Sequence, residues 1–296
     1  MIPDQCERNR DSNPDKMPIT DESARRAYWT EQMELGYSMV EHLLEHPVSD
    51  CGESFADIPA AAEAAGVEMW FSDSKIVGDM DRVFHLRESN VREIVAIGSD
   101  MNERGWILKI EDGFRSLEMQ GTLVRKPEVF DAVVKKCIWE NGGQLPSVEF
   151  VARRAIVMVA NIPKIGGHMS GSAIDISVFR RDDGSEISRG GPYLTVDETT
   201  PMRSPFISEE DLQNRLEITE VMESHGFMHF PYEFWHFSKG DVADRIMNDD
   251  SAPAQYGAVN WDPETNAVIP VEDPKRPLNP LSQIEKEIEA ALERLR

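Results

Sequence analysis

Residues 166–175 read GGHMSGSAID and place one histidine and one aspartate among small residues. The glycines let the backbone bend sharply around His168. Residues 173–180 (AIDISVFR) have the composition of a β-strand, in which Asp175 shares one face with small side chains while the β-branched residues point into the core. A carboxylate held on such a strand has the fixed position that a metal ligand requires. We expect a hairpin-like reversal at Ser170–Gly171 to bring His168 beside Asp175.

A second stretch, YEFWHFS at residues 232–238, can complete such a site. Glu233 and His236 stand three residues apart among aromatic side chains, and this apolar setting would raise the pKa of Glu233 towards the range of a general base. His168, Asp175 and His236 would then leave one open coordination position, which is the arrangement of a catalytic zinc. Zinc would acidify a water in that position while Glu233 takes its proton. The alternative for this strand is a core pair in which Glu233 and His236 contact each other.

The remaining histidine pairs lack the signature of a metal site. His42 and His46 are four residues apart but are not part of an HExxH motif, and Gly226 interrupts the helical spacing of His225 and His229. We therefore interpret both pairs as structural.

The composition of the 296-residue chain narrows the classes of function. A net charge of −23 would repel nucleic acid, so a DNA- or RNA-binding role is disfavoured. No run approaches the ~18 apolar residues of a membrane span, and the polar N-terminus has no apolar segment typical of a signal peptide. The three cysteines are scattered and odd in number, which favours a reducing compartment without disulfides. We expect a cytoplasmic protein that binds neither nucleic acid nor membrane.

The order of predicted elements indicates an α+β fold. The chain begins with helices and continues with a mainly antiparallel sheet flanked by helices, rather than with alternating strands and helices. We expect strands where β-branched and aromatic residues cluster, at residues 67–71, 106–112, 149–163, 173–180, 226–230 and 233–238. Apolar periodicity, caps and terminal glycines predict helices at residues 21–45, 54–66, 90–104, 127–140 and 208–225.

We divide the chain into three parts. Residues 1–21 are polar and without periodicity, which predicts disorder. Residues 22–245 form one catalytic domain, and residues 246–296 form a Pro-containing tail that ends in an amphipathic helix from Leu281. This helix is short for a coiled coil, so we expect it to dock on the body of the chain; self-association into a homo-oligomer is the alternative.

The two stretches together resemble the zinc D-Ala-D-Ala dipeptidases of the VanX type, which are related to the D,D-carboxypeptidases and to the hedgehog fold. The resemblance rests on the spacing of His168, Gly171, Ala173 and Asp175 and on the downstream EFWH. It extends to GWILKIEDGFRS, AIDISVFRRDDGSE, VDETTPM and the helix SEEDLQNRLEITEVMESHGF, which follow in the order and spacing of the family. It covers residues 85–240 and implies a hedgehog/D,D-peptidase-like fold.

The resemblance implies roles for the residues of both stretches. One zinc ion per chain would be held by His168, Asp175 and His236. Glu233 would be the general base that later passes its proton to the leaving amine. Arg115 would stabilise the oxyanion, because a fixed cation favours charge that appears only in the transition state.

Three further residues receive roles around the substrate. The resemblance assigns Asp197 to the free ammonium group of the substrate, on its DET context alone, and Trp235 to the wall of the pocket. Trp235 has the alternative of packing only, as an aromatic residue in an aromatic strand. Asp112 stands three residues before Arg115, so we expect its carboxylate to orient the guanidinium.

Two departures from the family pattern bear on the substrate. Gly166 stands where the family usually has serine, and Ser116 stands where it usually has proline. Both lie where a short substrate would be held, so the preference for D-Ala-D-Ala itself stays open. Neither departure touches the zinc ligands or the base.

The resulting hypothesis is a zinc metallopeptidase that hydrolyses D-Ala-D-Ala or a similar D,D-dipeptide through a metal-bound water and a Glu general base. It would serve cell-wall turnover or antibiotic resistance, with the small dipeptide as its partner. The alternatives are a D,D-carboxypeptidase or endopeptidase acting on larger muropeptides, and a non-catalytic zinc-binding module. The lack of a signal peptide argues against the first alternative. The presence of Glu233 and Arg115 argues against the second, because binding zinc requires neither.

Overall fold

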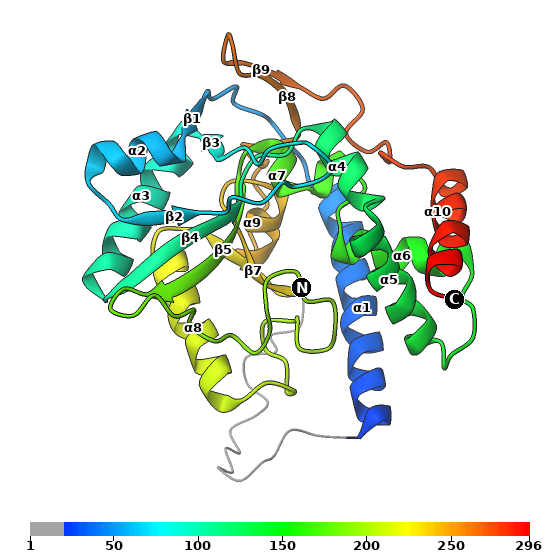
Figure 1. Cartoon of the computed structure of the whole chain (residues 1–296). Coiled ribbons are helices and arrows are strands. Elements are labelled where there is room, and N and C mark those ends of the chain that lie inside the picture. Colours follow the sequence, from blue (N-terminus) through cyan, green and yellow to red (C-terminus); the bar gives the residue numbers. More distant parts are fainter. Residues whose placement is uncertain (1–20) are drawn as a thin grey trace.

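The computed structural model describes residues 21–296, in which a β-sheet half and a helical half stand side by side (Figure 1). The segment predicted to be disordered lies outside the described residues, apart from Asp21. The main sheet has five strands in the order β2-β4-β5-β7-β6. In chain order these are β2 (Met69–Phe71), β4 (Trp106–Asp112), β5 (Ala173–Arg180), β6 (Met228–Phe230) and β7 (Glu233–Ser238).

The sheet is mixed rather than wholly antiparallel. β2 pairs with β4 in parallel, whereas the pairs β4–β5, β5–β7 and β6–β7 are antiparallel. The parallel pair follows from the path of the chain, because the helix α3 (Glu88–Glu103) lies between β2 and β4 and returns the chain to the same end of the sheet. The fold is therefore mixed α/β, with a parallel edge that the sequence did not predict.

The main core lies between one face of the sheet and the helices α3 and α8 (Glu209–Ser224). On β5, Ile174, Ile176 and Val178 point into this core and are fully buried, each contributing about 1.5–3 kcal/mol. The alternation of the strand turns Asp175 to the opposite face. That face looks towards the helical half and carries the candidate site.

The helical half contains a segment that the sequence predicts to be a strand. Its helices are α1 (Glu22–Glu45), α4 (Leu117–Val124), α5 (Pro127–Glu140), α6 (Val148–Met158) and α10 (Leu281–Arg294). The strand predicted at residues 149–163 is wrong, because most of this segment forms α6. Ser147 caps the helix by accepting from the N–H of Phe150 at 3.2 Å. Val151 and Ala155, four residues apart, are buried in the cluster with α5 and α10, so helical packing overrides the local strand preference of β-branched residues.

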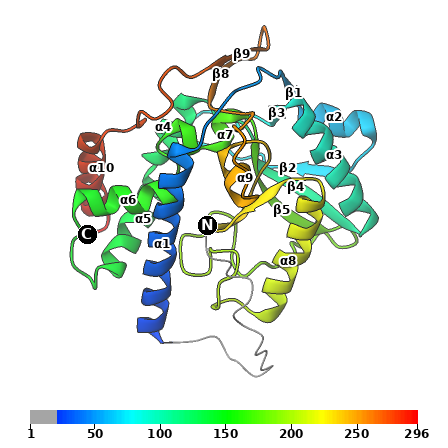
Figure 2. The ribbon, with the colours of Figure 1, turned by 180° about the vertical axis from the view of Figure 1, so that it is seen from behind.

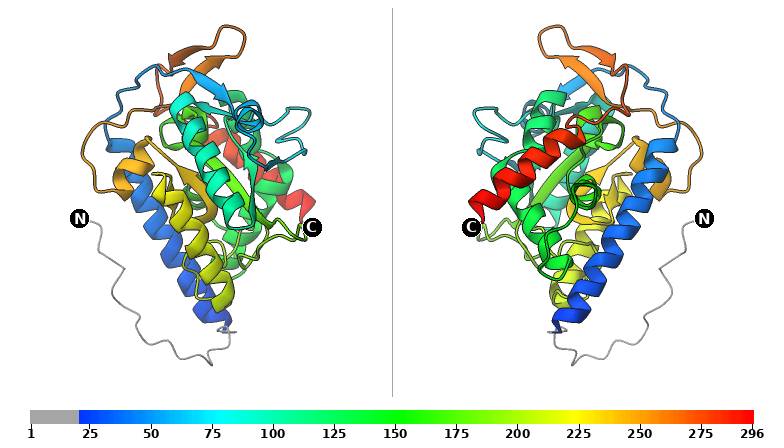
Figure 3. Two further views of the ribbon diagram at one scale, coloured as in Figure 1. Left: turned by 90° about the vertical axis from the view of Figure 1, so that its left-hand side faces the viewer. Right: turned by 90° about the vertical axis from the view of Figure 1, so that its right-hand side faces the viewer.

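The tail has more regular structure than the sequence predicts. It begins in α9 (Val242–Met247) and continues with a hairpin of β8 (Val259–Asp262) and β9 (Ala267–Pro270). α10 then lies against α5 and α6 on the outer side of the helical half (Figure 3, right). The apolar face of α10, for which self-association was the alternative, is thus covered by α5 and α6 of the same chain. Its buried residues are Ile284, Ile288 and Ala291.

The short helix α9 contacts both halves. Seen from behind, α9 lies between α1 and the sheet (Figure 2). A separate antiparallel pair of β1 (Phe55–Asp57) and β3 (His85–Arg87) flanks the helix α2 (Ile58–Ala65), which ends at Gly66 as predicted. Among residues 21–296, no helix combines the length and apolar character needed to cross a membrane.

Candidate metal centre

His168 lies in a single helical turn, α7 (Gly167–Ser170), and not in the hairpin reversal that the sequence predicts. The turn ends at Gly171 with a φ of 70°, in the left-handed region that favours glycine. A Cβ at Gly171 would lie 2.2 Å from the ring of Phe55, so a side chain does not fit here. Because β5 follows this turn directly, His168 lies beside Asp175 even without a hairpin.

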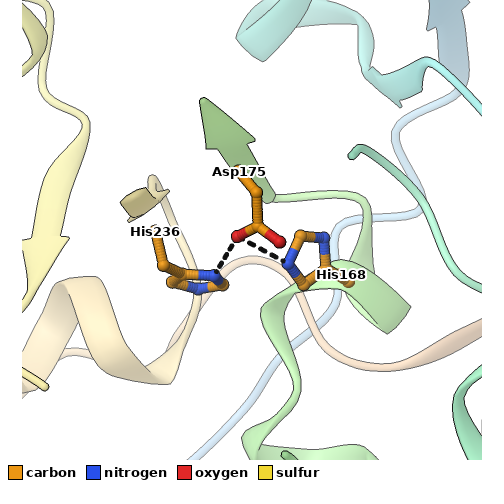
Figure 4. A group of neighbouring side chains, drawn as sticks. All are labelled: His168, Asp175 and His236. Atoms are coloured by element: carbon orange, nitrogen blue, oxygen red, sulfur yellow. Dashed lines mark hydrogen bonds and ion pairs between the residues drawn. The ribbon is translucent and has the colours of Figure 1, made fainter. Parts of the chain in front are cut away.

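The pairing of two strands brings His236 to Asp175. The two residues stand opposite each other in the antiparallel pair β5–β7. One ligand atom from each of His168, Asp175 and His236 lies within 4.8 Å of the other two (Figure 4). Oδ1 of Asp175 is 2.9 Å from Nδ1 of His236 and 3.3 Å from Nε2 of His168. Within the described residues, no other group of three such side chains is close enough to hold a metal ion.

Two of the three side chains, His168 and Asp175, are also held by groups outside the cluster. Nδ1 of His168 donates to the carbonyl of Gly113 at 2.6 Å, which turns Nε2 towards Asp175. Oδ2 of Asp175 accepts from Nη2 of Arg115 at 3.0 Å and from the hydroxyl of Tyr193 at 2.9 Å. Such outer partners fix the tautomer and orientation of metal ligands. The two imidazoles and one carboxylate therefore fit a zinc ion with one open position.

The charge states of Asp175 and His168 also suit a cation. Burial opposes ionisation of Asp175, yet His168 and Arg115 hold the pKa of its carboxyl well below its usual range. Burial and the nearby Arg115 lower the pKa of His168. Burial acts in the same direction on His236, but the hydrogen bond to Asp175 gives its pKa a net increase. An ionised Asp175 and a neutral His168 are the forms that bind a metal ion.

Arg115 follows a β-bulge, where the register of β4 shifts between Ile110 and Asp112. Its Nε donates to Oδ2 of Asp112 at 2.7 Å, and its Nη1 donates to Oε1 of Gln120 at 3.2 Å. Asp112 thus orients the guanidinium, as the sequence predicts. With Nη2 on Asp175, three of the five N–H groups of a guanidinium are engaged within the described chain. The guanidinium lines the same cavity as the metal ligands, so its remaining N–H groups can meet a substrate.

Glu233 is the first residue of β7 and lines this cavity. Burial raises the pKa of its carboxyl to about 8, although the positive charges of His236 and Arg115 act in the opposite direction. A carboxyl with such a pKa both takes up and releases a proton near neutral pH, as a general base and acid requires.

The cavity has a volume of about 130 Å³. Its polar side is the metal cluster with Arg115 and Glu233, and its apolar side comes from α1, α4 and α6. Trp235 lines the cavity and packs edge-on against Tyr193, with the ring centroids 5.7 Å apart. Sequence reasoning missed Tyr193, because it lies in an irregular segment without a motif and only its tertiary position reveals it.

Asp197 is not brought to this cavity. Its Oδ1 accepts from the backbone N–H of Thr199 at 2.8 Å and from the Thr199 hydroxyl at 2.5 Å. The described residues that line the cavity do not include Asp197. This oxygen therefore stabilises a local turn, and the contact of Asp197 with a substrate stays a prediction.

The structure shows the surroundings of both departures from the family pattern. The side chain of Ser116 accepts from the N–H of Met119 at 3.2 Å and caps α4. A Cβ at Gly166 would lie 2.3 Å from Cε of Met169, so a serine has no room there unless Met169 moves. Gly166 consequently lines the cavity with backbone alone.

The histidines interpreted as structural lie away from the cluster. His225 and His229 each stand beside a carboxylate, and His42 and His46 each stand beside a backbone carbonyl. None of the four is among the described residues that line the cavity.

The sequence profile of the peptidase M15 family, described as D-Ala-D-Ala dipeptidase, matches residues 86–255. This chain belongs to that family. The D-alanyl-D-alanine dipeptidase of Enterococcus faecium is 23% identical over 229 residues, which cover 76% of this chain and 97% of that protein. The D-alanyl-D-alanine dipeptidase of Enterococcus faecalis is 24% identical over 167 residues, which cover 55% of this chain and 73% of that protein. The matched region contains the whole cluster from Arg115 to His236.

Two solved structures show a weaker similarity. The LD-carboxypeptidase LdcB has a TM-score of 0.34 and 17% identity, with 64% of this chain and 72% of that chain covered. A Zn(II) complex of the vancomycin resistance D,D-pentapeptidase VanY has a TM-score of 0.34 and 15% identity, with 60% of this chain and 85% of that chain covered. The family assignment rests on the sequence profile, which spans more than half of the chain.

Proposed function

We propose that this chain is a zinc dipeptidase that hydrolyses D-Ala-D-Ala or a similar D,D-dipeptide. The proposal is carried by the convergence of His168, Asp175 and His236 beside Glu233, in one cavity of a D-Ala-D-Ala dipeptidase family member. When bound, one zinc ion per chain supplies a Lewis acid that polarises the peptide carbonyl and acidifies water. Three protein ligands with an open position are typical of catalytic zinc, whereas structural zinc sites use four protein ligands.

Glu233 is the general base in this proposal. Its carboxylate faces the cavity, takes a proton from the attacking water and passes it to the leaving amine of the C-terminal residue. The pKa of about 8 allows the carboxyl to hold this proton between the two steps. General acid–base catalysis of this kind contributes about 10²- to 10⁴-fold to the rate.

Arg115 stabilises the negative charge that develops on the carbonyl oxygen. Asp112 and Gln120 hold the guanidinium in place, so no reorganisation is needed when that charge appears. Trp235 and Tyr193 wall the cavity beside it. Their rings exclude water, and a fixed cation acts more strongly on a developing charge where water is excluded.

The test is the release of free D-Ala from D-Ala-D-Ala by the purified, zinc-loaded protein, with Glu233→Ala as the control. We expect release by the wild type and a rate at least ~10²-fold lower for the variant. A pentapeptide that ends in D-Ala-D-Ala, assayed alongside, distinguishes a dipeptidase from a carboxypeptidase. Zinc binding without release from the dipeptide would contradict the proposal, and equal rates for both proteins would contradict the role of Glu233.

We also place the reaction in the cytoplasm. Cys51 and Cys137, the cysteines among the described residues, are both free thiols, as is usual in a reducing compartment. Cell fractionation tests this assignment: the protein should be recovered with cytoplasmic markers, and recovery from an exported fraction would contradict it.

A further inference from the structure

The cavity has a second wall beyond the metal centre, built by the end of α4, the start of α5 and the segment that precedes β3. Leu123, Lys126 and Val129 follow one another at intervals of three residues, and Ile76 packs beside them. These four residues are called the Lys126 wall. Apart from the ammonium of Lys126, the side chains of this wall are apolar.

Lys126 differs from the other cations that line the cavity. Nη1 of Arg82 lies 3.3 Å from Oδ2 of Asp112, and Arg115 is bound to the same carboxylate at 2.7 Å. Nζ of Lys126 contacts the backbone carbonyl of Ile76 at 3.3 Å, and no carboxylate pairs with it in the part of the chain from residue 21 onwards. In a chain with a net charge of −23, this half-buried ammonium is left for an anion from outside.

The Lys126 wall is continuous with the metal centre through α4. Gln120 accepts from Nη1 of Arg115 at 3.2 Å, and Leu123 follows one turn later on the same side of the helix. The N–H of Lys126 then donates to the carbonyl of Leu123 at 3.0 Å, just beyond the end of α4. Arg115 and Lys126 therefore line one cavity, just before and just beyond α4.

We propose that Lys126 binds the C-terminal carboxylate of the dipeptide, while Leu123 and Val129 contact the side chain of its C-terminal residue. This inference rests on the proposed function, because it takes the substrate to be a dipeptide zwitterion. Such a dipeptide carries one carboxylate, which belongs to the C-terminal residue that leaves after cleavage. The flexible stem of lysine ends in three donors that suit a carboxylate as a point charge. The apolar neighbours strengthen this attraction by excluding water, and they accept an alkyl side chain. Lys126 thus determines specificity for a free C-terminus.

The experiment is steady-state hydrolysis of D-Ala-D-Ala and of its C-terminal amide by the zinc-loaded wild type, Lys126→Met and Lys135→Met. Lys135 is exposed on α5 and provides a matched control. We expect Lys126→Met to raise KM for the free dipeptide about ten- to hundredfold with little change in kcat, and to leave hydrolysis of the amide unchanged. Lys135→Met should match the wild type. Lys126→Arg should keep most of the preference for the free dipeptide, because it keeps the charge.

An unchanged ratio of kcat/KM for the two substrates in Lys126→Met would overturn the inference. Calorimetry with zinc-loaded Glu233→Ala measures the binding of the two compounds without turnover. It therefore separates a failure of this inference from a failure of the proposed function. If the wild type releases no D-Ala, the role of Lys126 can still be tested by binding. It is supported if Glu233→Ala binds D-Ala-D-Ala more tightly than its amide and if this difference disappears when Lys126→Met is added to the same protein. Equal or undetectable binding of both compounds overturns it.

Discussion

Nη2 of Arg115 donates to Oδ2 of Asp175 at 3.0 Å, so the residue proposed to stabilise the oxyanion also holds a proposed metal ligand in position. The other oxygen of Asp175 is thereby left to face both histidines. One guanidinium would therefore link the geometry of the metal centre to the charge that the proposed reaction creates.

Replacing Arg115 by lysine should reduce both catalysis and metal affinity. A single ammonium cannot reach Asp112, Gln120 and Asp175 at once, as the guanidinium does. We expect kcat to fall about 10²- to 10³-fold and zinc affinity about 10- to 100-fold, measured by steady-state kinetics and by competition with a chelator.

Tyr193→Phe, which removes one hydrogen bond to Asp175, should weaken zinc binding with a much smaller loss of kcat. Wild-type kcat in Arg115→Lys would exclude the oxyanion role.

Replacing Glu233 by glutamine should stop turnover without releasing the metal. Glutamine keeps the size of the side chain but cannot accept the proton, so kcat should fall by at least ~10²-fold. Zinc content, measured on the same preparation, should remain that of the wild type, because the three ligands lie elsewhere. Loss of zinc together with activity would instead make Glu233 a ligand.

The raised pKa of Glu233 predicts a pH-dependent stability of the metal-free protein. Its carboxyl titrates near 4.5 when unfolded and at about 8 when folded, so between these values the folded state holds a proton that the unfolded state has lost. The wild type should therefore lose stability relative to Glu233→Gln as pH rises through this range, by at most about 1.4 kcal/mol per pH unit. Urea denaturation of both proteins with chelator, at the two ends of the range, measures the difference. A difference that is constant with pH would show that Glu233 is not desolvated.

Zinc should stabilise the protein through His236 and not through His229. A metal that binds only the folded state raises Tm, and a site that has lost one of three ligands binds it much more weakly. We expect added zinc to raise Tm for the wild type and for His229→Ala, whose imidazole lies beside Glu223 away from the cluster. His236→Ala should show little or no rise. An equal rise in all three proteins would place the metal at another site.

The C-terminal helix should behave as part of the folded body. Ile284 is 2% exposed in the cluster formed with α5 and α6, whereas Leu281 on the same helix is 53% exposed. Ile284→Ala should lower the free energy of unfolding by about 2–5 kcal/mol. Leu281→Ala should change the free energy of unfolding by no more than about 0.5 kcal/mol. Chemical denaturation measures both. Similar small losses would mean that α10 contributes little to the stability of the chain.

The sequence by itself determined the residue types of the site and the elements that carry them. The alternation in AIDISVFR predicts β5 with Ile174 and Ile176 in the core and Asp175 on the other face, and the structure has this arrangement. Caps and periodicity predict α5 and α8 closely. These features depend on neighbours within a few residues, so the local pattern is enough to identify them. The same local preference misleads at residues 149–163, where β-branched residues form a helix because packing against α5 and α10 outweighs it.

Only the tertiary structure decided which of these groups meet. The register of β5 and β7 sets His236 opposite Asp175, and the bulge in β4 sends Arg115 to the same carboxylate. Tyr193 joins from an irregular segment, whereas Asp197, four residues later, stays in a local turn. Contacts between residues tens of positions apart depend on strand pairing and helix packing across the whole chain, and no local pattern encodes them.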